Sequence, residues 1–368
     1  MEKLPLSINA VLKALSYVED PDLKKDVVSL NMIRDLKIEG HQVFFRLVLT
    51  TPACPLKEVL VRACENAIRQ FIIGSPEVHI SVDAQVTTRH TDRLILPSVK
   101  NIIAVASGKG GVGKSTIAVN LALFLAREGA ATGLLDADIH GPSVPVMLGI
   151  KGVRPEVVDI EGKPKIVPVE IAGVKVMSIG LLIEDAQAVV WRGPMVSSAL
   201  KQFVSDCQWS ELDYLIVDLP PGTGDIHLTL VQTVPLSGVI IVTTPQEVAL
   251  ADARKATAMF RMKPINVPVL GIVENMSYFV PPDMPDRRYP IFGEGGGQRL
   301  ADEFGVPLLG QIPLSPALRE KEDQGTTANP LDLPEVIQTA FCALAREVAR
   351  QIAVQNATFE RSEVSVGA

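Results

Sequence analysis

Apolar runs alternating with helical patterns make up most of the chain after about residue 100. The run Asn101–Ser107 is apolar and partly β-branched, as buried parallel strands are, and residues 116–127 carry apolar side chains at helical spacing. Further strand-like runs are Leu134–Leu135, Tyr214–Asp218, Val239–Pro245, Val269–Met276 and Leu308–Pro313. The pattern predicts an α/β domain with a mostly parallel sheet and helices on both faces.

The first 90 residues follow a different pattern, typical of a small α+β domain. Two helical stretches and several extended runs predict its elements: helices over Ala10–Val18 and Leu56–Phe71, and strands over Val27–Leu30, Ile33–Ile38, Val43–Leu49 and Val78–Val86. We therefore expect a small domain over residues 1–90, a linker over 91–99 and the α/β domain over 100–352. The polar residues 353–368 are expected to be a disordered tail.

Composition narrows the function classes. The 368 residues are 47% hydrophobic with a net charge of −7, enough for two buried cores. No basic run is present, which disfavours a nucleic-acid partner, and no apolar stretch is long enough to span a membrane. The four cysteines are too widely spaced for a disulfide framework, and the N-terminus lacks the apolar segment of a signal peptide. We expect a cytoplasmic protein with no membrane or nucleic-acid partner.

A glycine-rich stretch after the Asn101–Ser107 run fits the phosphate-binding pattern G-x-x-x-x-G-K-[ST]. Glycines let successive backbone N–H groups point at one anion, and the helix that follows adds its partial positive charge. In this pattern Lys114 reaches the β- and γ-phosphates of ATP, and the Ser115 hydroxyl binds Mg²⁺. The residues predicted to bind the nucleotide here are Gly108, Lys109, Gly110, Gly111, Val112, Gly113, Lys114, Ser115 and Thr116.

Lys109 is a second lysine in this loop. Two ammonium groups so close repel each other unless a polyanion lies between them, although an exposed surface lysine is the alternative. The stretch Lys109–Thr116 resembles the deviant Walker A loop of the family that contains MinD, ParA, the nitrogenase iron protein and the Mrp/ApbC-type iron–sulfur carriers. The resemblance implies a P-loop ATPase fold and a homodimer, in which Lys109 reaches the partner's ATP and takes part in catalysis.

Two acidic segments complete the predicted nucleotide site. Asp136 and Asp138 follow the apolar Leu134–Leu135 run and resemble switch I of that family, which implies that Asp138 positions the attacking water and Asp136 supports the metal's water shell. Helix or turn capping is the alternative for this pair. Asp218 ends the run from Tyr214 and is the predicted Walker B carboxylate, holding Mg²⁺ through water.

Further polar residues follow the same strands. Asp225 lies in a Pro-Pro-Gly-Thr-Gly-Asp stretch that resembles switch II and is a candidate for reporting the nucleotide state to a partner. Asn275 lies in a segment that resembles the family's adenine-contacting motif, with an Asx turn as the alternative. Pro313 is predicted to lie near the base.

The cysteines offer one candidate metal ligand. Cys54 precedes Pro55, predicted as the first residue of a helix, and a helix N-terminus stabilises the thiolate that iron–sulfur clusters bind. A loop cysteine without a ligand is the alternative. The other three, Cys64, Cys207 and Cys342, are expected to be structural.

The segment from Asp20 to Leu56 resembles the small domain of iron–sulfur assembly factors. The order of the two domains, with the ATPase after the small domain, matches that of the Mrp/ApbC-type carriers over about residues 5–350. The resemblance implies an ATP hydrolase that carries a cluster, of the 4Fe–4S type, from an assembly scaffold to apoprotein clients. In that family a Cys-x-x-Cys pair holds the cluster, but here Ser277–Gly293 contains no cysteine, and Asp283 and Met284 are poor replacements. Cys54 is therefore the leading candidate ligand.

Two other functions remain open at this point. One is a MinD/ParA-like positioning or adaptor ATPase that holds no cluster. The other is an ATP-dependent reductase, which would need two interface cysteines per subunit.

Overall fold

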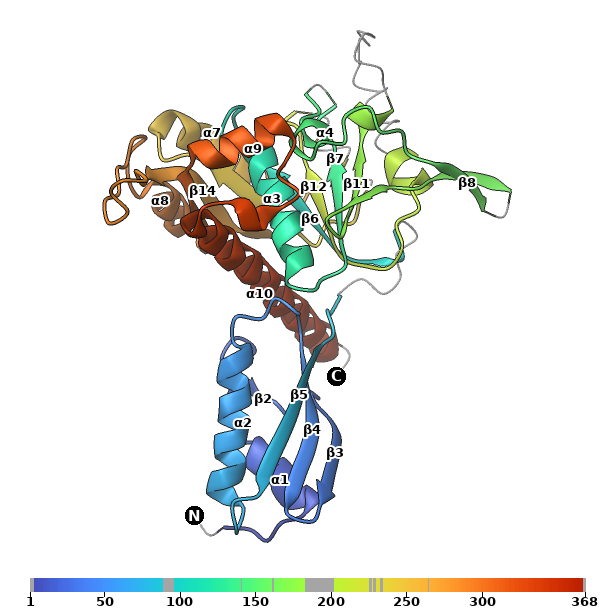
Figure 1. Ribbon diagram of the computed structural model, residues 1–368, viewed down its shortest axis with the longest axis vertical. Coiled ribbons are helices and arrows are strands. Elements are labelled where there is room, and N and C mark those ends of the chain that lie inside the picture. Colours follow the sequence, from blue (N-terminus) through green and yellow to red (C-terminus); the bar gives the residue numbers. More distant parts are fainter. Residues whose placement is uncertain are drawn as a thin grey trace. The chain divides into compact units, whose positions relative to one another are not determined.

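The computed structural model describes residues 3–88, 96–139, 141–160, 162–182, 202–224, 227, 230–231, 234–263 and 265–366, the last eight as backbone only. The chain forms two compact units (Figure 1). One consists of Met1–Arg89 and Ala349–Ala368, and the other of His90–Val348. In the described residues no helix is long and apolar enough to cross a membrane.

The first unit is α+β, as expected. A three-stranded sheet has the order β3-β4-β5, with β3 antiparallel and β5 parallel to the central β4. Alternate residues of β4 are buried, which gives the sheet one face toward the core that it shares with α1 and α2. The elements are α1 (Ile8–Leu15), β1 (Glu19–Asp20), β2 (Lys25–Asp26), β3 (Ile33–Glu39), β4 (Gln42–Leu49), α2 (Lys57–Phe71) and β5 (Glu77–Ala84).

One predicted strand of this unit is wrong. Residues 27–30, expected to be extended, form turns. The Asp26 carboxylate accepts hydrogen bonds from the backbone N–H groups of Val28 and Ser29, so a local side chain satisfies the donors that a strand would have paired.

The end of the chain also differs from the expectation. Helix α10 (Glu335–Val366) includes most of the segment expected to be a disordered tail. Its apolar spacing continues past the expected boundary with the buried Ile352 and Ala353. Within the first unit, Asn356 donates to the Thr87 carbonyl at 2.9 Å, and Arg350 pairs with Asp22 at 2.7 Å. The two units divide at Ala349 rather than at residue 352.

The second unit is built on an eight-stranded sheet in the order β10-β11-β7-β12-β6-β13-β14-β15. Every neighbouring pair is parallel except β10 with β11. The mostly parallel sheet expected from the apolar runs is therefore confirmed. Its strands are β6 (Val99–Ala106), β7 (Thr132–Asp136), β10 (Val169–Ile171), β11 (Val174–Ser178), β12 (Leu212–Asp218), β13 (Gly238–Thr243), β14 (Val269–Phe279) and β15 (Leu308–Leu314).

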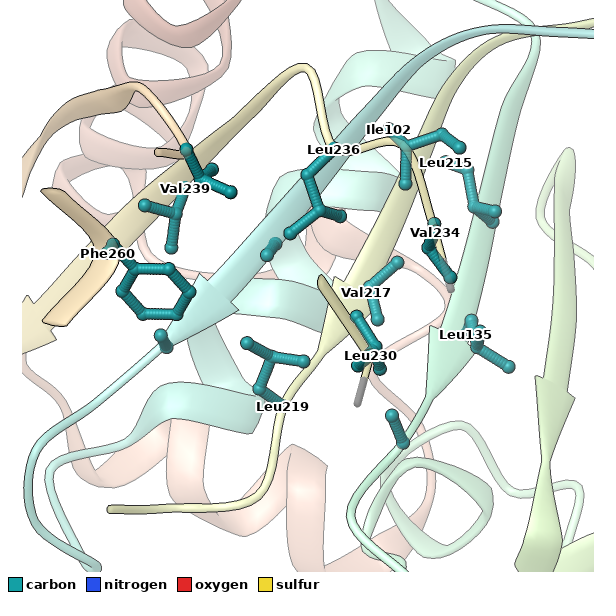
Figure 2. Close-up of a cluster of buried hydrophobic side chains, with 14 of the residues drawn as sticks. Ile102, Leu135, Leu215, Val217, Leu219, Leu230, Val234, Leu236, Val239 and Phe260 are labelled. Carbon is teal, nitrogen blue, oxygen red and sulfur yellow. The ribbon is translucent and has the colours of Figure 1, made fainter. Parts of the chain in front are cut away.

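Helices cover both faces of this sheet. On one face α3 and α10 pack together, where Phe124 stacks on Phe341. On the other face α7 and α8 cover a core of buried side chains, and Figure 2 shows part of it, with Phe260 of α7 against the sheet. A separate two-stranded ribbon joins β8 to β9. The remaining elements are α3 (Lys114–Arg127), α4 (Val144–Met147), β8 (Val157–Ile160), β9 (Lys163–Ile166), η1 (Ile179–Leu181), α7 (Glu247–Arg261), α8 (Gly296–Phe304), α9 (Pro316–Gln324) and η2 (Pro330–Asp332).

Candidate functional site

The glycine-rich loop joins β6, the strand flanked by β12 and β13, to the first residue of α3. Gly111 and Gly113 have φ angles of 80° and 81°, in the left-handed region that favours glycine. A side chain on Gly113 would collide with the Asn275 amide, and one on Gly108 with the backbone of α7 at Asp252. The strand–turn–helix arrangement that the motif requires is therefore present, with the first-turn N–H groups of α3 at the loop.

Four predicted site residues converge at this helix start. The Lys114 ammonium lies 2.6 Å from one oxygen of Asp218, and the Ser115 hydroxyl donates to the other oxygen at 2.6 Å. The same ammonium lies 3.7 Å from Asp138. Asp218 is fully buried and the Asp138 side chain is 14% exposed, so only the second carboxylate has access to solvent. In this arrangement Asp218 is bonded to both Lys114, which the motif assigns to phosphate, and Ser115, which the motif assigns to the metal.

Asp136 lies beside this cluster because of strand register. It pairs with Asp218 of β12 on one side and with Ser178 of β11 on the other. The Ser178 hydroxyl donates to Asp136 at 2.9 Å, and the backbone N–H of Asp138 donates to its other oxygen at 3.1 Å. Burial, and then the negative charge of Asp218, raise the pKa of Asp136 to about 8. Burial also raises the pKa of Asp218, while Lys114 opposes that shift.

The donors at this point fit Mg²⁺. The Ser115 hydroxyl and the Asp218 carboxylate are hard oxygen ligands 2.6 Å apart. Within the described residues no group of three or more His, Cys, Asp and Glu side chains could hold a metal ion by itself.

Asn275 and Pro313, the two residues predicted to lie near the adenine base, have surroundings that differ from each other. Asn275 is buried, and its amide donates to the Val112 carbonyl at 2.9 Å, so it stabilises the phosphate-binding loop. Pro313 lines a cavity of 860 Å³ at the carboxyl ends of β14 and β15, together with Tyr278 and Ser315. Ligands of open α/β sheets bind at such strand ends. Lys109 is exposed at the loop, and Asp225 lies outside the described residues.

Sequence reasoning missed three residues near this site. Ser178 ends β11 as a polar residue after an apolar strand, which is the same signal that identified Asp218. His227 is buried beyond the Pro-Pro-Gly stretch, where its ring bonds to the Pro220 carbonyl at 2.9 Å, and burial lowers its pKa. Glu322 of α9 bonds to Thr116 of the loop. No local motif distinguishes His227 or Glu322.

The surroundings of Cys54 differ from the expectation. Helix α2 begins at Lys57, so Pro55 precedes the helix instead of opening it. Burial raises the pKa of the half-buried Cys54 thiol, and the charges of Asp20 and Asp22 add to the shift. Backbone N–H groups at the helix start oppose it, but the burial effect is larger. The expectation of a stabilised thiolate is therefore wrong in direction.

The other cysteines have surroundings typical of structural residues. Burial raises the pKa of Cys64 and of Cys207 to about 12. The Cys342 thiol donates to the Glu128 carboxylate at 3.2 Å.

Comparisons with known proteins match both units. A family model described as an iron-transfer P-loop NTPase of the NUBPL type matches residues 98–349, and one described as an iron–sulfur cluster assembly protein matches residues 8–82. A protein of Synechocystis named iron–sulfur cluster carrier protein is 50% identical over 351 residues, which cover 95% of this chain and 99% of the relative. The protein of the same name from Salmonella typhimurium is 42% identical, covering 96% and 94%.

A solved structure also resembles the chain. It is the nucleotide-binding protein of Archaeoglobus fulgidus in complex with ADP, with 38% sequence identity and a TM-score of 0.57. The match covers 66% of this chain and 92% of that protein.

Proposed function

The chain belongs to the family of iron-transfer P-loop NTPases, and on this basis we propose that it is an ATP-dependent carrier that delivers iron–sulfur clusters to apoproteins in the cytoplasm. The observation that carries the proposal is the convergence of Lys114, Ser115 and Asp138 on the buried Asp218 at the start of α3. Two findings support an iron–sulfur cluster as the cargo. The iron–sulfur assembly model matches residues 8–82, and relatives named as carriers align with almost the whole chain.

ATP binding exchanges the contacts of this cluster. The loop N–H groups take the phosphates, and Lys114 turns from Asp218 toward the β- and γ-phosphates. Ser115 and Asp218 would then be free to hold Mg²⁺. The metal supplies positive charge against the charge that develops on the transferred phosphoryl group. Asp138, the carboxylate with access to solvent, positions the attacking water.

The site is completed by a second copy in this proposal. Lys109 is exposed on the loop, where it can reach the nucleotide of the partner in a homodimer. Hydrolysis removes the γ-phosphate, Lys114 returns to Asp218, and the dimer opens. ATP turnover is thereby coupled to the affinity for scaffold and client.

Cys54 is the proposed cluster ligand of this chain. Its raised pKa means that it stays a thiol until the cluster displaces the proton. One thiolate does not hold a 4Fe–4S cluster, so the remaining ligands come from a second copy or from the client.

Anaerobic reconstitution tests the cargo. The full chain is incubated with iron, sulfide and Mg-ATP, and cluster content is measured by absorbance and Mössbauer spectra for the wild type, Cys54→Ala and Cys342→Ala. We expect a cluster in the wild type and in Cys342→Ala, and its loss in Cys54→Ala. A wild type that takes up no cluster alone or with an apoprotein client would favour the adaptor ATPase instead.

A further inference from the structure

An acidic side chain from α9 is bonded to the phosphate-binding loop. One oxygen of Glu322 accepts a hydrogen bond from the Thr116 hydroxyl at 2.9 Å, and the other accepts from the Asn120 amide at 3.5 Å. Thr116 is the last residue of the loop motif and lies in the first turn of α3, and Asn120 lies one turn later. The sequence separation between Glu322 and Thr116 is 206 residues, so only the fold brings them together.

Glu322 has no positive partner in the part of the chain that the structure describes. On its own helix, Arg319 pairs with Asp323 at 2.7 Å and Lys321 pairs with Asp332 of η2 at 3.4 Å. On α3, the neighbouring Lys114 is taken by Asp218. The two side chains that donate to Glu322, Thr116 and Asn120, are neutral.

Because of these surroundings, Glu322 gains or loses its charge near neutral pH. Burial raises the pKa of Glu322 to about 7, although the hydrogen bond from Thr116 opposes the shift. The neighbouring Asp323 raises it further. The carboxyl group is therefore neutral in mild acid and negative in mild base.

The position of this group matters because α3 begins at an anion site. Its first-turn N–H groups and the loop attract phosphate, and a negative Glu322 beside the same turn repels it. A neutral Glu322 removes that repulsion and leaves the packing unchanged.

We propose that Glu322 is a positioning residue that holds the Thr116 hydroxyl in the nucleotide-free loop and lowers nucleotide affinity when it is ionised. The inference rests on the proposed nucleotide binding at this loop and adds its regulation by pH. Affinity for a nucleoside diphosphate falls as the pH rises through the titration of Glu322, because ionisation adds a negative charge beside the phosphates.

The test is Mg-ADP affinity by calorimetry at pH 6 and pH 8 for the wild type, Glu322→Gln and a control, Glu303→Gln. Glutamine keeps the shape and an acceptor for Thr116 but carries no charge. The control removes the same charge from an exposed residue of α8 that pairs with Arg254. At pH 8 we expect Glu322→Gln to bind about 3- to 10-fold tighter than the wild type. At pH 6 the two should agree, and Glu303→Gln should follow the wild type at both.

Three results would overturn the inference. Equal affinities of the wild type and Glu322→Gln at pH 8 would show that the charge is not felt at the site. The same ratio at both pH values would show a structural effect, since ionisation is then irrelevant. Failure of the wild type itself to bind ADP would contradict the proposed function as well, which distinguishes the two failures.

Discussion

At the scale of single residues, the site is a balance of buried charges. Lys114 offsets the negative charge of Asp218, and strand register places Asp136 beside it. The Lys114 charge compensates Asp218, whereas Asp136, whose pKa is raised by burial and by the charge of Asp218, keeps its proton and so avoids the repulsion. Lys114 therefore offsets the charge of Asp218 in this structure, in addition to its proposed role in phosphate binding.

Replacing Lys114 should remove catalysis. In Lys114→Ala we expect ATP hydrolysis to fall by about 100-fold or more, because the main positive charge on the phosphates is lost. Phosphate release measures the rate. The control is Lys100→Ala, at the start of β6, where a partly exposed lysine pairs with Asp213. Hydrolysis by Lys114→Ala at the wild-type rate would disprove the site assignment.

The raised pKa of Asp136 predicts a pH dependence of stability. The folded state keeps this proton up to about pH 8, whereas the unfolded chain releases it near pH 4. Folding therefore binds a proton between these values, and this contribution to stability is lost as the pH rises, by about 1 kcal/mol per pH unit. Denaturant unfolding at pH 5 and pH 8 should show a smaller loss in Asp136→Asn than in the wild type. Parallel losses in both proteins would contradict the raised pKa.

At the scale of elements, α9 links several parts of the second unit. Its first residues follow Pro313, its Glu322 bonds to α3, and its end crosses the segment after α4. The crossing is backbone to backbone at Gly149 and Gly325, which both have positive φ. Because α4 follows Asp138 along the chain, α9 physically connects the strand end at Pro313 with the segment after Asp138.

A side chain at that crossing should be costly. In Gly149→Ala the new methyl group would collide with the Gly325 carbonyl, in addition to the left-handed φ of 66°. We expect a loss of about 2 kcal/mol or more. Gly152→Ala is the matched control, since its φ is 82° but nothing lies within 4 Å of the added atom, and it should cost about 1 kcal/mol. Unfolding by denaturant compares them, and equal losses would mean that the crossing tolerates the methyl group.

At the scale of the whole molecule, the chain joins a unit that matches the iron–sulfur assembly model to a P-loop NTPase unit. The first unit carries Cys54, and the second carries the cluster of side chains around Asp218. The proposed cluster ligand and the proposed nucleotide site thus lie in different units.

The proposed homodimer can be tested by mixing two inactive variants. Lys109→Ala keeps Lys114, and Lys114→Ala keeps Lys109, so a mixed dimer contains one complete site only if Lys109 acts on the partner's nucleotide. Random pairing should restore about a quarter of the wild-type ATP hydrolysis. Light scattering with ATP checks that both variants dimerise. No recovery in dimeric mixtures would place Lys109 in its own subunit's site or outside catalysis.

The sequence by itself determined the elements on both sides of the loop. Apolar period and glycine position are local, so β6, the loop and α3 could be predicted, as could the identities of Lys114, Ser115 and Asp218. The turn after Asp26 and the continuation of α10 were missed, because a side-chain hydrogen bond and packing outweighed local pattern.

Only the tertiary structure decided which groups meet. Strand order brings Ser178 and Asp218 to the two sides of Asp136, and the path of α9 brings Glu322 to Thr116. The tertiary structure also places the Asn275 amide against the loop and buries Cys54 enough to raise its pKa. These contacts depend on distance and burial between residues far apart along the chain, and neither quantity is encoded in local periodicity.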